Sequence, residues 1–157
     1  MNIGDKLPEI LGKDQDGNEI RTADYAGRKF ILYAYPKDNT SGCTAEACSL
    51  RDHREQLRSL GYDIIGVSKD SETSHKKFIE KQELNFPLIA DTDTTLLQQL
   101  GAWGEKNMYG KKTMGTLRTT YLIDENGRVA DIFTPKQIKT KEHAQQIIDR
   151  VSKEQQQ

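Results

Sequence analysis

One short segment, an apolar run closed by a proline, limits most strongly what this chain can fold into. The run extends from Phe30 to Tyr35, and Pro36 follows at once. Its length and its aromatic and β-branched residues are typical of a buried strand, and a proline cannot continue the hydrogen bonds of a sheet. A polar stretch follows as far as Gly42, and beyond it apolar residues recur at helical spacing. The sequence therefore predicts a buried strand that leads through a loop into a helix.

The predicted helix begins at Cys43 and ends before Gly61. Ala47, Leu50 and Leu57 share one stripe with Cys43, because steps of four, seven and fourteen residues return within about 40° of the starting direction. A cysteine on this stripe faces the core, and buried cysteines usually serve only as small apolar side chains. The stripe alone therefore favours a structural role for Cys43.

Strands and helices alternate along the rest of the chain. Strands are predicted at residues 62–67, 86–90, 117–123 and 128–133, and helices at 71–82, 94–100 and 140–153, with a loop over 101–115. Asn126-Gly127 predicts a hairpin that pairs the last two strands antiparallel, and Asp16-Gly17 predicts a turn within a short N-terminal hairpin. This order predicts an α/β fold in one domain, residues 1–157, with a central mixed sheet flanked by helices.

The balance of charges narrows the range of partners. The chain has 23 Lys and Arg against 24 Asp and Glu, so no strong field of one sign favours nucleic acid or an anionic membrane. No apolar run of about 18 residues occurs, and the first residues show no basic stretch followed by an apolar one. We therefore expect a soluble, cytoplasmic protein that binds neither nucleic acid nor membrane.

The two cysteines, Cys43 and Cys48, lie five positions apart. Two are too few for the disulfide framework of a secreted protein, and in a reducing cytosol such a pair suggests redox chemistry. Zinc is the competing interpretation, but zinc usually takes four ligands, and the candidates His53, His75 and His143 are scattered. We therefore expect no metal and no flavin or haem cofactor.

The position of Cys43 in the first turn of its helix favours a reactive thiol. Either Thr40 or Ser41 can act as the N-cap, and the free N–H groups and dipole of a helix start stabilise a thiolate. Gly42 allows a substrate or another part of the backbone to approach closely, and Pro36 ends the strand from which the loop departs. We expect a narrow site that stabilises an anion.

This segment resembles the active site of the peroxiredoxins, in which Pro, three residues, Thr or Ser, and two residues precede a Cys. Pro36, Thr40 and Cys43 match that pattern residue for residue. The wider string through Cys48, followed by Arg51-Asp52, is similar to the branch of bacterioferritin comigratory protein, also called peroxiredoxin Q. Later segments at 86–91, 101–106 and 118–124 are similar to the same branch.

The resemblance implies a thioredoxin-like fold and a thiol peroxidase. Its substrates would be hydrogen peroxide and organic hydroperoxides, and its reductant would be thioredoxin or a similar dithiol protein. Proteins of this branch occur as monomers and dimers, and a monomer is our expectation here. The preferred peroxide and the physiological reductant stay open.

The resemblance also implies the roles of individual residues. Cys43 is the peroxidatic nucleophile, which attacks the weak O–O bond and becomes a sulfenic acid. Thr40 and Arg118 donate hydrogen bonds to the peroxide oxygens, although an arginine in a strand is otherwise most often a solvated edge residue. Glu46 orients Arg118 or the Thr40 hydroxyl, or only favours the helix dipole. These alternatives for Glu46 are left open.

Cys48 is the expected resolving cysteine. Five helical steps place its Cα roughly 8.7 Å from that of Cys43, beyond the usual span of a disulfide. The first turns of the helix must therefore unwind before Cys48 can attack the sulfenic acid, as the resemblance implies, and form an intramolecular disulfide for thioredoxin to reduce. The alternative is that Cys48 has no role and that an external thiol resolves Cys43.

Two other functions are weighed against the peroxidase. General disulfide exchange would carry the C-x-x-C signature, which this sequence lacks. A peroxide-sensing or redox-binding module of the same fold needs a reactive thiol but no fast turnover. The combination of Thr40, Cys43 and Arg118 argues for turnover, so the peroxidase is the prediction.

Overall fold

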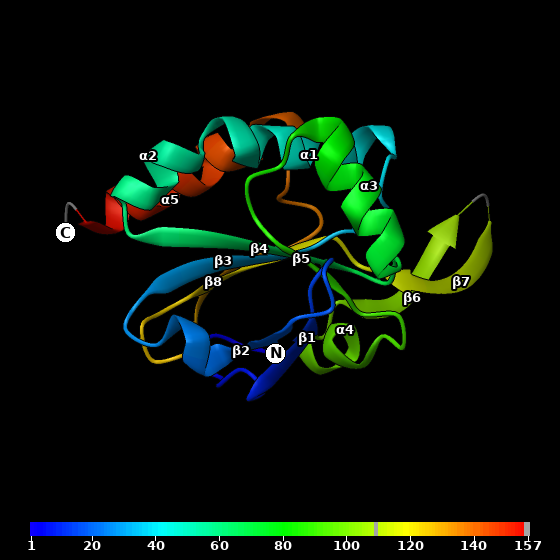
Figure 1. The fold of residues 1–157 in the computed structure, drawn as a ribbon, viewed down its shortest axis with the longest axis horizontal. Coiled ribbons are helices and arrows are strands. Elements are labelled where there is room, and N and C mark those ends of the chain that lie inside the picture. The colour runs from blue at the N-terminus through cyan, green and yellow to red at the C-terminus, as the bar shows by residue number, and fades with distance from the viewer. Residues whose placement is uncertain (109, 156–157) are drawn as a thin grey trace.

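A five-stranded mixed sheet lies at the centre of this computed structural model, which describes residues 1–108 and 110–155 (Figure 1). The strands lie in the order β5-β4-β3-β8-β9. β4 pairs parallel with β3 and β5, whereas β8 pairs antiparallel with β3 and β9. Their bounds are β3 (Lys29–Ala34), β4 (Tyr62–Ser68), β5 (Leu88–Ala90), β8 (Thr119–Ile123) and β9 (Val129–Phe133). The predicted α/β class with a mixed sheet is confirmed.

Helices cover both faces of this sheet (Figure 1). One face carries α1 (Ser41–Asp52), α2 (Arg54–Ser59), α3 (Glu72–Gln82) and α5 (His143–Gln155). The other carries α4 (Thr95–Leu100) and the predicted N-terminal hairpin, β1 (Ile10–Lys13) with β2 (Glu19–Arg21). Two 3-10 turns, η1 (Thr22–Tyr25) and η2 (Thr140–Glu142), precede β3 and α5.

The central strand β3 is buried on both faces. Ile31 and Tyr33 belong to the core under α1 and α5, whereas Phe30 and Leu32 belong to the core on the opposite face. A strand covered on both sides is continuously apolar instead of alternating, which explains the run from which the fold was predicted. The loop after β3 therefore starts from a strand that is packed on both faces.

The predicted helix over residues 43–60 is wrong in one respect, because the structure divides it into α1 and α2 at His53. The backbone of His53 leaves helical geometry, with φ −107° and ψ 14°. Its ring Nδ1 lies 2.8 Å from the Ser49 carbonyl oxygen, which also accepts the His53 N–H at 3.3 Å. A side chain that competes for a helical carbonyl in this way bends the helix.

The predicted loop over 101–115 is also wrong. Residues on either side of its tip form an antiparallel hairpin, β6 (Trp103–Met108) and β7 (Lys111–Thr116), which projects from one end of the molecule (Figure 1). Lys111, Lys112 and Met114 in β7 are exposed, so no apolar alternation marks the strand.

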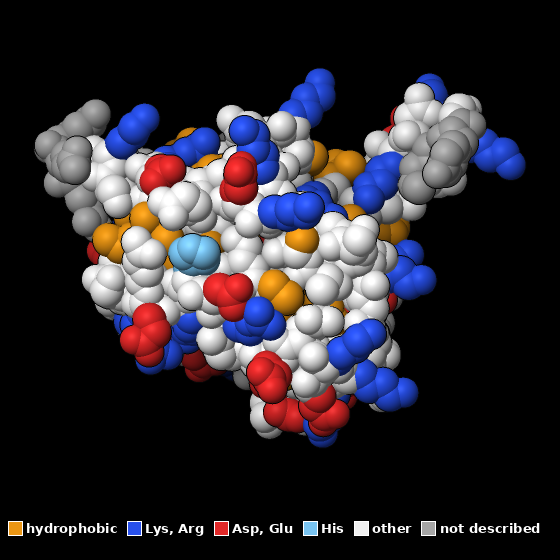
Figure 2. Space-filling model, turned by 90° about the horizontal axis from the view of Figure 1, so that it is seen from above, with side chains coloured by type: hydrophobic (Ala, Val, Ile, Leu, Met, Phe, Trp, Pro, Cys, Tyr) orange, Lys and Arg blue, Asp and Glu red, His pale blue; other side chains and the backbone are white. Residues whose placement is uncertain are grey.

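The outer face formed by α1, α3 and α5 carries mixed charges. Viewed from that side, Lys and Arg side chains are interspersed with Asp and Glu, and apolar atoms form only small spots (Figure 2). None of the described helices combines the length and apolar character that crossing a membrane would require.

Candidate functional site

The loop between β3 and α1 carries the predicted site. It leaves the carboxyl end of the central strand through Pro36, and α1 begins at Ser41 with Thr40 as its N-cap residue. The Thr40 hydroxyl donates to the Lys37 carbonyl at 3.0 Å, so it bonds within the loop and not to the helix. The backbone of α1 therefore keeps its first N–H groups free of a side-chain cap.

Cys43 lies in the first turn of α1 and is 1% exposed. Ala47 and Leu50 accompany it in the core, as the stripe predicted. Its sulfur, however, accepts a hydrogen bond from Arg118 Nη2 at 3.3 Å. A permanent cation on a buried sulfur stabilises the thiolate, which a purely structural cysteine does not require.

Strand pairing brings Arg118 to this loop. Arg118 directly precedes β8, and Thr119 at the start of β8 pairs with Ala34 at the end of β3. The guanidinium then forms a fork, with Nη2 on Cys43 and Nη1 on Glu46 Oε1 at 2.6 Å. Burial lowers the pKa of Arg118, but Glu46 and Cys43 outweigh that effect and raise it. The interpretation as a solvated edge residue does not apply.

Glu46 is fully buried. Of the two side chains that it was expected to contact, Arg118 and Thr40, it hydrogen-bonds to Arg118. Oε1 accepts from Arg118, whereas Oε2 has no hydrogen-bond partner in the part of the chain that the structure describes. Burial raises the pKa of Glu46 from 4.5 to about 7, although Arg118 acts in the opposite direction. The carboxyl therefore changes its charge near neutral pH.

A buried polar group behind Glu46 was not predicted. His143 Nε2 lies 3.9 Å from Glu46 Oε2 and 2.8 Å from Thr120 Oγ1, while its Nδ1 lies 3.0 Å from Gln146 Oε1. Gln146 Oε1 also accepts from the Lys139 N–H, so Nδ1 carries the proton and Nε2 accepts from Thr120. Burial lowers the pKa of His143 to about 4, and the ring is neutral. The one signal in the sequence for this group was Thr120, because residues two apart in an extended chain, such as Arg118 and Thr120, point to the same side.

Cys48 faces a different neighbour from Cys43. It is half-buried, and its Sγ lies 3.6 Å from Gln82 Oε1 at the end of α3. Both cysteines are free thiols, and α1 is continuous between them. On α5, the Ala144 N–H donates to Ser49 Oγ at 3.1 Å, which ties the middle of α1 down. A disulfide therefore requires α1 to unwind, because a regular helix keeps residues five apart roughly 8.7 Å from each other.

A shallow hollow of about 660 Å³ opens beside Arg118. Its apolar walls are Pro36, Leu117, Pro135 and Ile138, with Lys106 and Lys136 among the polar residues of its lining. Burial and the neighbouring Arg118 lower the pKa of Lys106. The hollow gives a small molecule with an apolar group access to the guanidinium.

One cluster of potential metal ligands occurs among the described residues. Ligand atoms of Asp38, Asp70 and His75 lie within 4.8 Å of one another. Each of these side chains already takes part in hydrogen bonds, since Asp38 Oδ2 faces His75 Nδ1 and Asp70 Oδ2 accepts from the Asp38 N–H, both at 2.8 Å. The cluster is a closed hydrogen-bond network and not an open ligand set.

Replacing Glu46 should change how stability depends on pH. A carboxyl whose folded pKa is raised keeps its proton between pH 4.5 and about 7, where the unfolded chain has lost it. Folding is therefore penalised progressively as pH rises through this window, by about 3 kcal/mol at its upper end. Glu46→Gln has no such penalty, so urea unfolding should show its advantage over the native chain growing from pH 5 to pH 8.

The matched control for this measurement is Glu55→Gln, on the exposed surface of α2. Its stability should follow that of the native chain at every pH. Parallel pH curves for Glu46→Gln and the native chain would contradict the raised pKa of Glu46.

Comparison with known proteins was made for the sequence and for the fold. Residues 3–132, which include Pro36, Thr40, Cys43, Glu46, Cys48 and Arg118, match the AhpC/TSA family. Peroxiredoxin Bcp of Escherichia coli (strain K12) is 37% identical over 149 residues, covering 95% of this chain and 94% of that protein. A putative peroxiredoxin bcp of Coxiella burnetii is 40% identical over 151 residues, covering 96% and 99%.

Solved structures show the same similarity. A cysteine-to-serine mutant of Xylella fastidiosa PrxQ matches with a TM-score of 0.88 and 32% identity, covering 98% of this chain and 97% of that one. Xanthomonas campestris bacterioferritin comigratory protein matches with a TM-score of 0.86 and 30% identity, covering 98% and 99%. The latter structures are described as trapped intermediate and ligand complexes that bear on alkyl peroxide reduction.

Proposed function

Since this chain belongs to the AhpC/TSA family, among relatives of peroxiredoxin Bcp and peroxiredoxin Q, it is a thiol peroxidase, and we propose that Cys43 is its peroxidatic nucleophile. One observation carries this assignment, the hydrogen bond of 3.3 Å from Arg118 Nη2 to Cys43 Sγ. The permanent positive charge of Arg118 beside this sulfur supports a role for Cys43 as an anionic nucleophile.

In the first half of the cycle, the Cys43 thiolate attacks the distal oxygen of the hydroperoxide. The O–O bond breaks, Cys43 becomes a sulfenic acid, and the other oxygen leaves as an alkoxide or hydroxide that takes up a proton. Arg118 stabilises the negative charge that passes from sulfur to the leaving oxygen. Glu46 holds Nη1, so that Nη2 stays directed at the reacting atoms.

Thr40, the N-cap residue of α1, orients the peroxide from the loop that precedes Cys43. Its hydrogen is engaged by the Lys37 carbonyl, which leaves the oxygen lone pairs to accept from the peroxide O–H. This role as acceptor replaces the role as donor that the resemblance implied. Pro36 contributes shape, because it forms part of the wall of the hollow next to Arg118.

In the second half of the cycle, Cys48 resolves the sulfenic acid. The first turns of α1 unwind, the Cys48 thiol attacks the sulfur of Cys43, and water leaves as the intramolecular disulfide forms. A thioredoxin-type dithiol protein then reduces the disulfide by thiol exchange. Both cysteines come from α1 of one chain, so the cycle requires only a monomer.

Cys48→Ser should separate the two halves of the cycle. The variant is expected to reduce one equivalent of peroxide at the native rate, because nothing around Cys43 changes, and then to stop as a sulfenic acid. Rapid quenching with a sulfenic acid reagent measures the first step, and thioredoxin-dependent oxidation of NADPH measures turnover. Normal cycling of this variant would show that an external thiol resolves Cys43.

Intact mass spectrometry tests the assignment of the disulfide. After one equivalent of peroxide, the native chain should lose the mass of two hydrogen atoms within a single chain, and peptide mapping should link Cys43 to Cys48. A chain of doubled mass under non-reducing conditions would refute the intramolecular disulfide and the monomeric cycle.

A further inference from the structure

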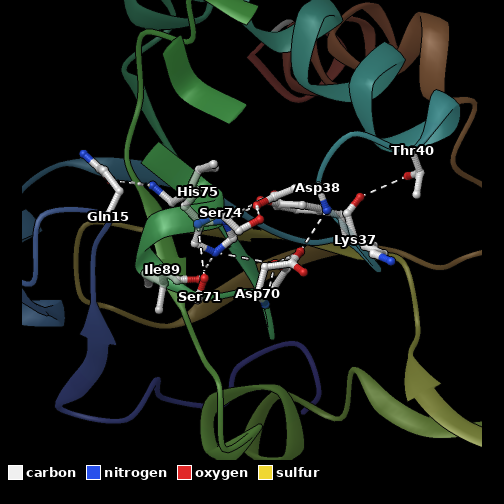
Figure 3. Close-up of polar contacts among 12 residues, drawn as sticks. Gln15, Lys37, Asp38, Thr40, Asp70, Ser71, Ser74, His75 and Ile89 are labelled. Atoms are coloured by element: carbon white, nitrogen blue, oxygen red, sulfur yellow. Dashed lines mark hydrogen bonds and ion pairs between the residues drawn. The ribbon is translucent and has the colours of Figure 1, made fainter. Parts of the chain in front are cut away.

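A buried polar network lies beside the loop that leads to Cys43 (Figure 3). At its centre, the carboxylate of Asp38 accepts hydrogen bonds from three side chains. They are Tyr35 Oη at 2.6 Å on Oδ1, and Ser74 Oγ and His75 Nδ1, each at 2.8 Å on Oδ2. The side chains of Asp38 and His75 are 2% and 0% exposed. The network therefore joins the loop to Tyr35, which directly follows β3, and to α3, and its central carboxylate is buried.

The hydrogen-bond partners of His75 define its charge. Nε2 lies 3.0 Å from the Ile89 carbonyl oxygen, which can only accept, so Nε2 carries a proton. Nδ1 faces Asp38 Oδ2. Burial alone would raise the pKa of Asp38, but hydrogen bonds from His75, Tyr35 and Ser74 more than offset it and lower the pKa. Asp38 is thus a carboxylate, both nitrogens of His75 donate, and the two form a buried ion pair.

The network fixes the backbone of the loop as well as its side chain. The Asp38 N–H donates to Asp70 Oδ2 at 2.8 Å, and Ser68 Oγ donates to the same oxygen at 2.8 Å. Asn39, the next residue, has a positive φ of 63°, a left-handed conformation that asparagine adopts more readily than most other L-residues. Thr40 and the start of α1 follow directly.

Stability alone does not explain a buried ion pair at this position. Apolar residues of similar volume in place of such a pair are often as stable, because both charges lose their hydration. An ion pair with directional hydrogen bonds does, however, fix one atom relative to another. The part of the chain fixed here is the one that places Thr40 and Cys43.

We propose that His75 is a positioning residue for the peroxidase reaction, holding the loop 36–40 in place through its ion pair with Asp38. The inference rests on the proposed function of Cys43. The loop 36–40 stays fixed while α1 unwinds, so His75 affects the rate of peroxide attack on Cys43 and not the rate of the resolving step.

The state of the ion pair can be measured in the native protein. Nitrogen-15 spectra of the three histidines should show a proton on each ring nitrogen of His75, because both nitrogens face acceptors. The equally buried His143 provides the internal contrast, since it should be neutral with its proton on Nδ1. A neutral His75 ring would overturn the ion pair and with it the proposal.

His75→Phe tests the positioning role, because it keeps a ring and removes both donors. We expect the rate constant for Cys43 oxidation to fall by about 10- to 100-fold, the effect of misplacing a reacting group by a fraction of an ångström to an ångström. Rapid quenching and mass spectrometry should show the later conversion of sulfenic acid to disulfide within about 3-fold of the native rate, since α1 keeps its packing.

Two further variants give a graded series. Asp38→Asn removes the negative charge of the ion pair but leaves an amide that can donate to a neutral His75 ring, so its rate of Cys43 oxidation should lie between those of the native chain and His75→Phe. Tyr35→Phe removes one donor to Asp38 and should give a smaller loss than His75→Phe. If His75→Phe does not fold, Tyr35→Phe takes its place: slower oxidation of Cys43 with an unchanged rate of disulfide formation supports the positioning role, and a native oxidation rate overturns it.

Ile65→Val is the matched control, because Ile65 is buried on the opposite face of the sheet and its truncation destabilises the core without touching the loop. It should leave both rates unchanged. Equal slowing of oxidation and disulfide formation in His75→Phe, or no more effect than in Ile65→Val, would overturn the positioning role alone. If the native chain did not oxidise at Cys43, the proposed function would fail first.

Discussion

Cys43→Ser should lose peroxide consumption entirely, to the level of buffer without enzyme. A serine hydroxyl stays protonated where a thiol ionises, and oxygen is a poorer nucleophile toward peroxide than sulfur. Loss of a catalytic nucleophile lowers turnover by roughly a thousand-fold or more. Consumption of NADPH in the presence of thioredoxin, thioredoxin reductase and peroxide measures the effect.

The control for this result is Cys48→Ser, which also replaces a cysteine sulfur with oxygen in α1. It should still reduce one equivalent of peroxide, whereas Cys43→Ser should reduce none. Unfolding by urea should confirm that both variants are folded. Appreciable turnover by Cys43→Ser would remove the assignment of the nucleophile.

Arg118→Ala should lower the rate of Cys43 oxidation by about 100- to 1,000-fold, the usual cost of removing a preorganised donor to developing charge. The substitution deletes the 3.3 Å contact with Cys43 Sγ and the 2.6 Å contact with Glu46. Glu46 should then hold its proton to higher pH, because Arg118 is what lowers its pKa against the effect of burial. Stopped-flow or rapid-quench oxidation of the reduced protein measures the rate.

Arg118→Lys separates charge from geometry. Lysine keeps one positive charge but offers a single nitrogen in place of the fork, so it can serve Cys43 or Glu46 but not both. Its rate should lie between those of the native chain and Arg118→Ala. Arg58→Ala, on the exposed face of α2, is the neutral control. A native rate for Arg118→Ala would show that another group stabilises the thiolate.

The apolar run at residues 30–35 was sufficient to predict the centre of the fold, because a strand buried on both faces has no polar positions to obscure it. The β6–β7 hairpin escaped prediction for the opposite reason. It lies outside the main sheet, and β7 is mostly exposed, so burial imposes no alternation on its residues. The break at His53 escaped because it depends on a ring nitrogen that reaches a backbone carbonyl.

The site could be predicted only where it is local in sequence. The stripe of α1 and its N-terminus led to Cys43 from the residues themselves. The pairing of Arg118 with Cys43 depends on antiparallel pairing of β8 with β3, which no periodicity indicates, and Arg118 was found through the family resemblance alone. His75 was considered as one of three scattered histidines, because its partner Asp38 is 37 residues away. The confirmed parts are the family and the fold class, and the roles of single residues stay predictions.

The hydrogen bond between Ala144 and Ser49, together with the packing of Leu50 and Ala47, has a consequence for the lifetime of the oxidised enzyme. In the proposed cycle, these contacts oppose the unwinding of α1 that brings Cys48 to the sulfenic acid, so they lengthen the time for which that acid persists. During this interval a second peroxide can convert it to a sulfinic acid, which thioredoxin does not reverse. The strength of the contacts between α5 and α1 therefore determines what fraction of the oxidised molecules returns to another turnover and what fraction is permanently inactivated.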